Sequence, residues 1–169
     1  VNEYSWVGET MFQFQIPHDI YYFTFTFLMA LFMIILIPRE DIKRLFGISF
    51  VWGYFGSLVF VITLGRLMSL FSWQETAFTF LNSPFLLNLA WVPALMLYLY
   101  FLPKEKVLFW LYLLTFALVS AGLDSIFNQL GTLQYISWNP FARFIVAIVW
   151  LLSTTLHFKY LSKKKITIY

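Results

Sequence analysis

The sequence predicts an all-α integral membrane protein, a bundle of five transmembrane helices with its N-terminus outside and its C-terminus in the cytoplasm. Composition is the first observation: 61% of the 169 residues are hydrophobic and 11% are charged, whereas soluble domains have about 45–50% and about 25%. The second is five apolar runs of about 18–22 residues, each able to cross the ~30 Å hydrocarbon core as a helix. The third is that Lys and Arg gather in alternate connections.

Each predicted span has its own sequence signals. The five spans cover about residues 20–37, 45–64, 85–102, 107–126 and 140–161. Pro38 marks the end of the first span. In the second, Gly53, Gly56 and Ser57 predict the close approach of a neighbouring helix, because small side chains let two backbones come together. Pro93 removes a backbone hydrogen bond and is expected to kink the third span.

Three further segments flank or join these spans. Residues 1–19 are acidic and aromatic and contain no Lys or Arg, so we expect an interfacial segment rather than a secretory signal. Residues 65–84 form the longest connection and are expected to fold back onto the bilayer surface. Residues 162–169 form a basic cytoplasmic tail, which anionic lipids attract. A four-span alternative would remove span 20–37 or span 45–64 from the membrane.

The orientation follows from the distribution of basic residues, which are enriched on the cytoplasmic side of membrane proteins. With five spans, nine of them fall on one side: Arg39, Lys43, Arg44, Lys104, Lys106, Lys159, Lys163, Lys164 and Lys165. Only Arg66 and Arg143 fall near the other side. This asymmetry places the N-terminus outside.

A carboxylate lies near the outer end of the fourth span. Residues 107–123 contain no ionisable group, and Asp124 follows with Ser120 one turn before it and Asn128 one turn after it. Positions four apart share a helix face. A charge at the centre of a membrane helix costs about 2.5–3.5 kcal/mol on insertion scales. Asp124 is therefore expected to face protein or water and to have a partner.

The outer third of the bundle collects most of the other unusual polar residues. They are Asp19, Arg66, Glu75, Asn82, Asn88, Asn128, Asn139 and Arg143. One hypothesis is a structural ion pair of Asp124 with Arg66 or Arg143 that ties helix ends together. A second is a site for an amphiphile, because Arg binds carboxylate or phosphate in a bidentate way. Its candidate ligand-binding residues are Arg66, Asn88, Trp91, Asp124, Asn128, Trp138 and Arg143.

A third hypothesis is an intramembrane enzyme that acts on an isoprenoid or lipid by acid–base chemistry. Asp124 and Glu75 are its candidate catalytic residues, and aromatic walls would stabilise a cation. No motif specifies a reaction. There is no cysteine, and His18 and His157 are far apart in the sequence, so we expect neither a metal site nor a cofactor.

The fifth span carries a polar stripe. Arg143, Ala147, Trp150, Thr154 and His157 recur at helical spacing, and this face is expected to meet the fourth or the third span. The span starts at Pro140, which suits the first turn of a helix.

Three short stretches carry a resemblance to a known family. They are residues 37–39 (IPR), residues 87–93 (LNLAWVP) ahead of residues 98–103 (YLYFLP), and residues 135–139 (YISWN). In these the chain resembles an uncharacterised family of small polytopic integral membrane proteins, of about five spans, from spore-forming Gram-positive bacteria. The resemblance implies a multi-span fold in the cell membrane and no activity. It does not extend to the N-terminal segment.

Together these observations predict a multi-pass protein of the cell membrane that is structural or binds a lipid-like amphiphile. The alternatives are the isoprenoid or lipid enzyme and an accessory subunit of a larger membrane complex. The expected partners are membrane lipids, an amphiphilic or isoprenoid ligand, and a membrane-protein partner or a second copy of the chain. No nucleic-acid partner is expected, because the basic residues mark span ends.

Overall fold

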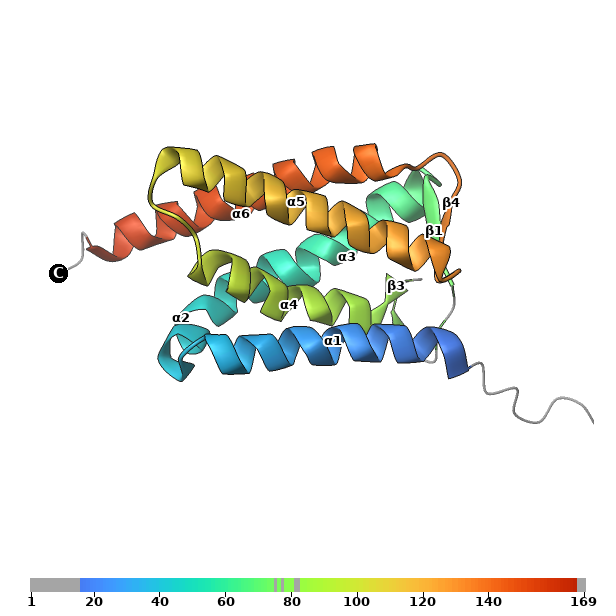
Figure 1. Cartoon of the computed structure of the whole chain (residues 1–169), viewed down its shortest axis with the longest axis horizontal. Coiled ribbons are helices and arrows are strands. Elements are labelled where there is room, and N and C mark those ends of the chain that lie inside the picture. Colours follow the sequence, from blue (N-terminus) through green and yellow to red (C-terminus); the bar gives the residue numbers. More distant parts are fainter. Residues whose placement is uncertain (1–15, 75, 77, 81–82, 167–169) are drawn as a thin grey trace, which may run out of the picture.

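The computed structural model describes residues 16–74, 76, 78–80 and 83–166 of the chain. Five helical segments run up and down along the long axis of the molecule (Figure 1). They are α1 (Ile16–Leu36), a continuous helix made of α2 (Arg39–Ser49), η1 (Phe50–Phe55), α3 (Gly56–Phe60) and η2 (Val61–Leu67), then α4 (Phe85–Tyr100), α5 (Lys106–Gln129) and α6 (Pro140–Ile166). The short strands are β1 (Phe71–Trp73), β2 (Thr79–Phe80), β3 (Ser83–Pro84) and β4 (Leu133–Tyr135).

Four of these helices are long and apolar enough to cross a membrane. They are α1, the continuous helix Arg39–Leu67, α5 and α6. The fifth, α4, has 16 residues and is about 24 Å long at 1.5 Å per residue. In α1, only 11% of the most apolar stretch is buried, which leaves most of its side chains for contact with lipid. A mostly helical bundle agrees with the predicted all-α membrane class.

The helix α4 is the centre of the bundle. It contacts α1, α2 and η1, and ten of its residues are buried, including Asn88 and Pro93. One apolar core packs around its C-terminal half and joins Leu45, Leu95 and Leu113. A second surrounds its N-terminal half and joins Tyr22, Phe71 and Phe127. The functional site lies against this second core.

The close approach predicted for the second span is confirmed. A Cβ atom on Gly53 would lie 2.8 Å from the carbonyl oxygen of Trp91, so only glycine allows η1 to approach the α4 backbone this closely. A Cβ atom on Gly56 would lie 3.0 Å from Nε1 of Trp150. Two stretches of this span, η1 and η2, are π-helical, a wider turn that leaves backbone carbonyls free for outside donors. The indole N–H of Trp150 donates to one of them, the oxygen of Trp52, at 3.2 Å.

Short strands cover one end of the bundle, and we call β1 with β4 the cap (Figure 1). The two strands are antiparallel, with Phe71 opposite Tyr135 and Trp73 opposite Leu133. The hydroxyl of Tyr22 donates to the oxygen of Thr132 at 3.1 Å, which fastens α1 to the cap. Residues 65–84 were predicted as a connection that folds back onto the bilayer surface, and no strand was predicted in them. Here β1 pairs with the connection between α5 and α6 instead, because strands of three residues are too short to show an alternating pattern.

Candidate functional site

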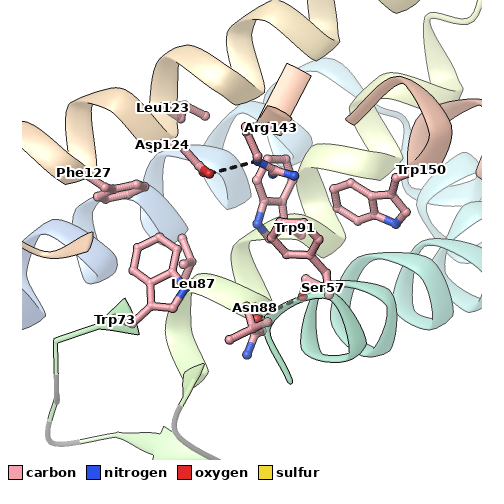
Figure 2. Close-up of a pocket in the computed structure, with 12 residues that line it drawn as sticks. Ser57, Trp73, Leu87, Asn88, Trp91, Leu123, Asp124, Phe127, Arg143 and Trp150 are labelled. Atoms are coloured by element: carbon pink, nitrogen blue, oxygen red, sulfur yellow. Dashed lines mark hydrogen bonds and ion pairs between the residues drawn. The ribbon is translucent and has the colours of Figure 1, made fainter. Parts of the chain in front are cut away.

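A small cavity lies just beneath the cap. Six elements meet there, and the residues that line it are Ser57, Phe60, Val61, Trp73, Leu87, Asn88, Trp91, Leu123, Asp124, Phe127, Arg143 and Trp150. Figure 2 shows Asp124 and Arg143 pointing toward one another from neighbouring helices. The space open to the centre of a water-sized sphere is about 20 Å³, which is enough for one buried water.

Two helix ends position the charged residues. Gly131 adopts a φ of +72° just after α5, and its N–H donates to Asn128 O while that of Thr132 donates to Phe127 O. This pattern is a Schellman motif, which ends a helix on a residue in the left-handed conformation. The next helix begins at Pro140, as predicted, and Asn139 caps it by accepting the N–H of Ala142 at 2.8 Å. Asp124 and Arg143 thus face each other across a short connection.

Asp124 and Arg143 form a buried ion pair. The Nε of Arg143 lies 3.1 Å from Oδ2 of Asp124, and the two side chains are 3% and 9% exposed. The structural hypothesis allowed Arg66 or Arg143 as the partner, and the structure brings Arg143 to Asp124. At this burial the attraction is little screened, and removing either partner would leave a charge in an apolar environment.

The Nε of Arg143 lies close to Asp124 but makes no hydrogen bond among the described residues. The guanidinium is packed instead on two aromatic rings. Its Cζ lies 4.8 Å from the ring centre of Phe60 and 5.5 Å from that of Trp91. Such cation–π contacts stabilise the charge. The indole N–H of Trp73, also on the cavity, is buried without a partner in the described chain. Each unpaired buried donor costs about 1–3 kcal/mol.

The one amide on the cavity already makes two buried hydrogen bonds. Asn88 is 1% exposed. Its Oδ1 accepts the hydroxyl of Ser57 at 3.1 Å, and its Nδ2 donates to the hydroxyl of Ser83 at 2.7 Å. This chain of hydrogen bonds joins α3, α4 and β3. Both polar atoms of Asn88 are therefore already bonded to serine hydroxyls.

Two aromatic residues of the cap region stand behind the pair. Trp138 is 7% exposed and packs on Phe71 with ring centres 5.3 Å apart. Burial is the largest influence on Tyr135 and raises the pKa of its hydroxyl above the ordinary 10.0, against smaller opposing effects of Ser125 and Arg143. A neutral phenol at this position avoids a second negative charge near Asp124.

The structure gathers only part of the predicted ligand-binding set. Four of its seven members, Asn88, Trp91, Asp124 and Arg143, line the cavity. The others do not: Arg66 is exposed on η2, Asn128 donates to the oxygen of Leu133 at 2.8 Å, and Trp138 packs on Phe60 and Phe71. The structure thus brings four of the seven together, and the ligand-binding role of all seven stays a prediction. The second candidate acid, Glu75, lies outside the described residues, as does Asn82.

Several cavity residues were not predicted as a site. Phe60, Trp73 and Trp150 supply aromatic walls, yet in the sequence they resemble the many other aromatic residues of a membrane protein. Ser57 gave a signal, because it belongs to the small-residue motif. Its second role, as a hydrogen-bond donor to Asn88, depends on how α4 packs against this helix.

A second cavity lies one helical turn further from the cap. It also offers about 20 Å³, and its lining residues are Trp91, Ala94, Leu95, Phe116, Ser120, Ala147, Trp150 and Leu151. Trp91 and Trp150 belong to both cavities, and their ring centres are 5.1 Å apart. The hydroxyl of Ser120, 4% exposed, has no partner among the described residues. The second cavity is thus apolar except for one hydroxyl.

The predicted stripe on α6 faces the bundle, as expected. Arg143 meets α5, and Trp150 meets Trp91 of α4. The stripe also meets the second span, which the sequence analysis did not expect: the indole N–H of Trp52 donates to Nδ1 of His157 at 2.8 Å.

Comparison with known protein families, with curated proteins and with solved structures gives no match. Within the described residues, no three His, Asp or Glu side chains lie close enough together to hold a metal ion. The site is therefore interpreted from its own geometry.

Proposed function

We propose that this chain is a non-enzymatic, five-span protein of the cell membrane, with its N-terminus outside, in which the polar cluster under the cap holds the bundle closed. The path of α4 supports its role as the fifth transmembrane span. This helix runs from the cap to the opposite end of the bundle, where Lys104 and Lys106 lie. A bilayer that thins locally around the bundle accommodates a short helix of this kind.

The observation that carries the structural role is the closed Asp124–Arg143 pair. A catalytic carboxylate has to exchange a proton with a substrate at hydrogen-bond distance. Asp124 is instead occupied by a guanidinium that is itself clamped between Phe60 and Trp91. Such a pair fixes the relative position of α5 and α6, and the cap and Asn88 tie the remaining helices to the same point.

The proposal is tested by replacing the pair with apolar residues, Asp124→Leu with Arg143→Met. A structural role predicts that this double variant stays folded and that the lipid and isoprenoid extract of cells expressing it matches that of cells expressing the unaltered chain. Asp41→Asn, a change on the surface of α2, is the matched control. A product that disappears in the double variant while the protein remains folded would overturn the non-enzymatic role.

A further inference from the structure

Two buried donors on the first cavity make no hydrogen bond among the described residues. They are the indole N–H of Trp73 and the Nε of Arg143, which lies 3.1 Å from Oδ2 of Asp124 without hydrogen-bond geometry. The Asn88 oxygen already accepts from Ser57. Buried polar groups in native proteins nearly always have a partner. The missing partner is therefore an acceptor, and the cavity is where it would lie.

The charge balance selects an uncharged acceptor. Asp124 already neutralises Arg143 at 3.1 Å. An anionic group in the same cavity would add a second negative charge beside the carboxylate, at a site with little screening. A carbonyl oxygen accepts two hydrogen bonds without bringing charge.

The shape selects a hydrophobic body behind that oxygen. The second cavity continues from Trp91 and Trp150 along α4, α5 and α6, away from the cap, and the small side chains of Ala94 and Ala147 leave room there. Its one polar group is the Ser120 hydroxyl. An apolar chain that follows this path lies parallel to the helices, as a lipid tail does in a bilayer.

We propose that the two cavities together bind an uncharged hydrophobic molecule that ends in a carbonyl oxygen. The oxygen accepts from Arg143 and Trp73, and the chain passes between Trp91 and Trp150 toward Ser120. Each cavity as it stands has room for one water, so binding requires these two indoles to separate. This inference goes beyond the structural role, which needs no ligand.

The test uses native mass spectrometry on the full chain purified in detergent, with three probes of equal chain length. They are methyl stearate, with a neutral carbonyl, stearate, with a carboxylate, and octadecane, with no acceptor. Methyl stearate is expected to bind saturably at one molecule per chain and at least about tenfold more tightly than either of the others, the effect of roughly one buried hydrogen bond. Three results would each overturn the proposal: tighter binding of stearate, equal binding of all three probes, or no saturable binding. The last result would mean that the cavities hold ordered water only.

A variant pair localises the site. Trp73→Phe removes the indole donor and keeps an aromatic ring, and Trp110→Phe makes the same change on the exposed face of α5. Methyl stearate is expected to bind about five- to tenfold more weakly to Trp73→Phe and unchanged to Trp110→Phe; equal affinities would contradict the assignment. The three-probe comparison uses the unaltered chain, so it tests the proposed binding even if a variant fails to fold. Competition by a diacylglycerol or by an isoprenoid quinone then tells whether the natural carbonyl is an acyl ester or a quinone.

Discussion

Breaking the Asp124–Arg143 pair from one side is expected to destabilise the protein strongly. Because the side chains are 3% and 9% exposed, the relevant magnitude is that of a buried pair, about 3–5 kcal/mol for the loss of one partner. Asp124→Asn is expected to cost more than Arg143→Met. A carboxylate left alone can bind a proton and become neutral, whereas a guanidinium stays charged.

The chain supplies a matched control for this measurement. Arg44 and Asp41 also form an ion pair, at 3.3 Å, but their side chains are 61% and 31% exposed, so Asp41→Asn is expected to cost less than about 0.5 kcal/mol. The assay is the free energy of unfolding in mixed detergent micelles, followed by tryptophan fluorescence.

The apolar double variant, compared with Asp124→Leu and Arg143→Met alone, tests whether the two costs are additive. If the two single costs were additive, Asp124→Leu with Arg143→Met would lose about 6–10 kcal/mol, but no charge is left unpaired, and we expect a loss below about 2 kcal/mol. Additive costs, or an Asp124→Asn variant as stable as Asp41→Asn, would refute the proposal that this pair locks the bundle.

Three further predictions concern single positions. Gly53→Ala is expected to destabilise by about 1–3 kcal/mol, because the new Cβ would meet the Trp91 backbone at 2.8 Å, whereas Gly47→Ala, with nothing within 4 Å, should stabilise by about 0.5–1 kcal/mol; equal unfolding free energies would contradict this. Burial raises the pKa of Tyr135 above 10.0 in the folded protein. The contribution of the neutral Tyr135 to the free energy of unfolding is therefore complete below pH 10, and it is lost as the pH rises through the higher folded-state pKa. A titration comparing the unfolding free energy of Tyr135→Phe with that of the unaltered chain should therefore be flat to about pH 10 and change above it, and a change at lower pH would exclude this cause. Asn88→Ala should cost about 1–3 kcal/mol in the same assay, because two buried hydrogen bonds are lost and the Ser83 hydroxyl loses its donor, while Ser57 keeps its bond to the oxygen of Tyr54; a loss under 1 kcal/mol would contradict the network.

The sequence predicted the helices well because the bilayer demands them. Long apolar runs, Pro38, Pro140 and the distribution of basic residues all report on crossing a membrane. The identity of the central helix was not predictable. Lipid is as apolar as a leucine side chain, so the buried α4 and the lipid-facing α1 are equally apolar in sequence.

The site was predicted in part for a related reason. A charged residue is rare in an apolar run, so Asp124 and Arg143 both stood out. Exposing a charge to lipid is costly, and both side chains were therefore expected to face protein or water. Arg66 stood out equally but lies exposed at a helix end, where a long side chain reaches water at little cost. Of the aromatic lining only Trp91 was predicted, since Trp and Phe are abundant throughout the chain. The aromatic residues that meet Arg143 are Phe60 of α3 and Trp91 of α4, and this contact depends on how three helices pack.

The most direct test of the account is the side of the membrane on which each end of the bundle lies. The chain has no cysteine, so single variants at the exposed positions Ser72, Lys104 and Ser137 each report one location to a membrane-impermeant maleimide. Ser72→Cys and Ser137→Cys are expected to react in intact cells, and Lys104→Cys only after permeabilisation, because α4 and α5 both separate it from the cap. Labelling of Lys104→Cys in intact cells together with the cap positions would show that these helices do not cross, and would contradict the five-span bundle on which the proposed function rests.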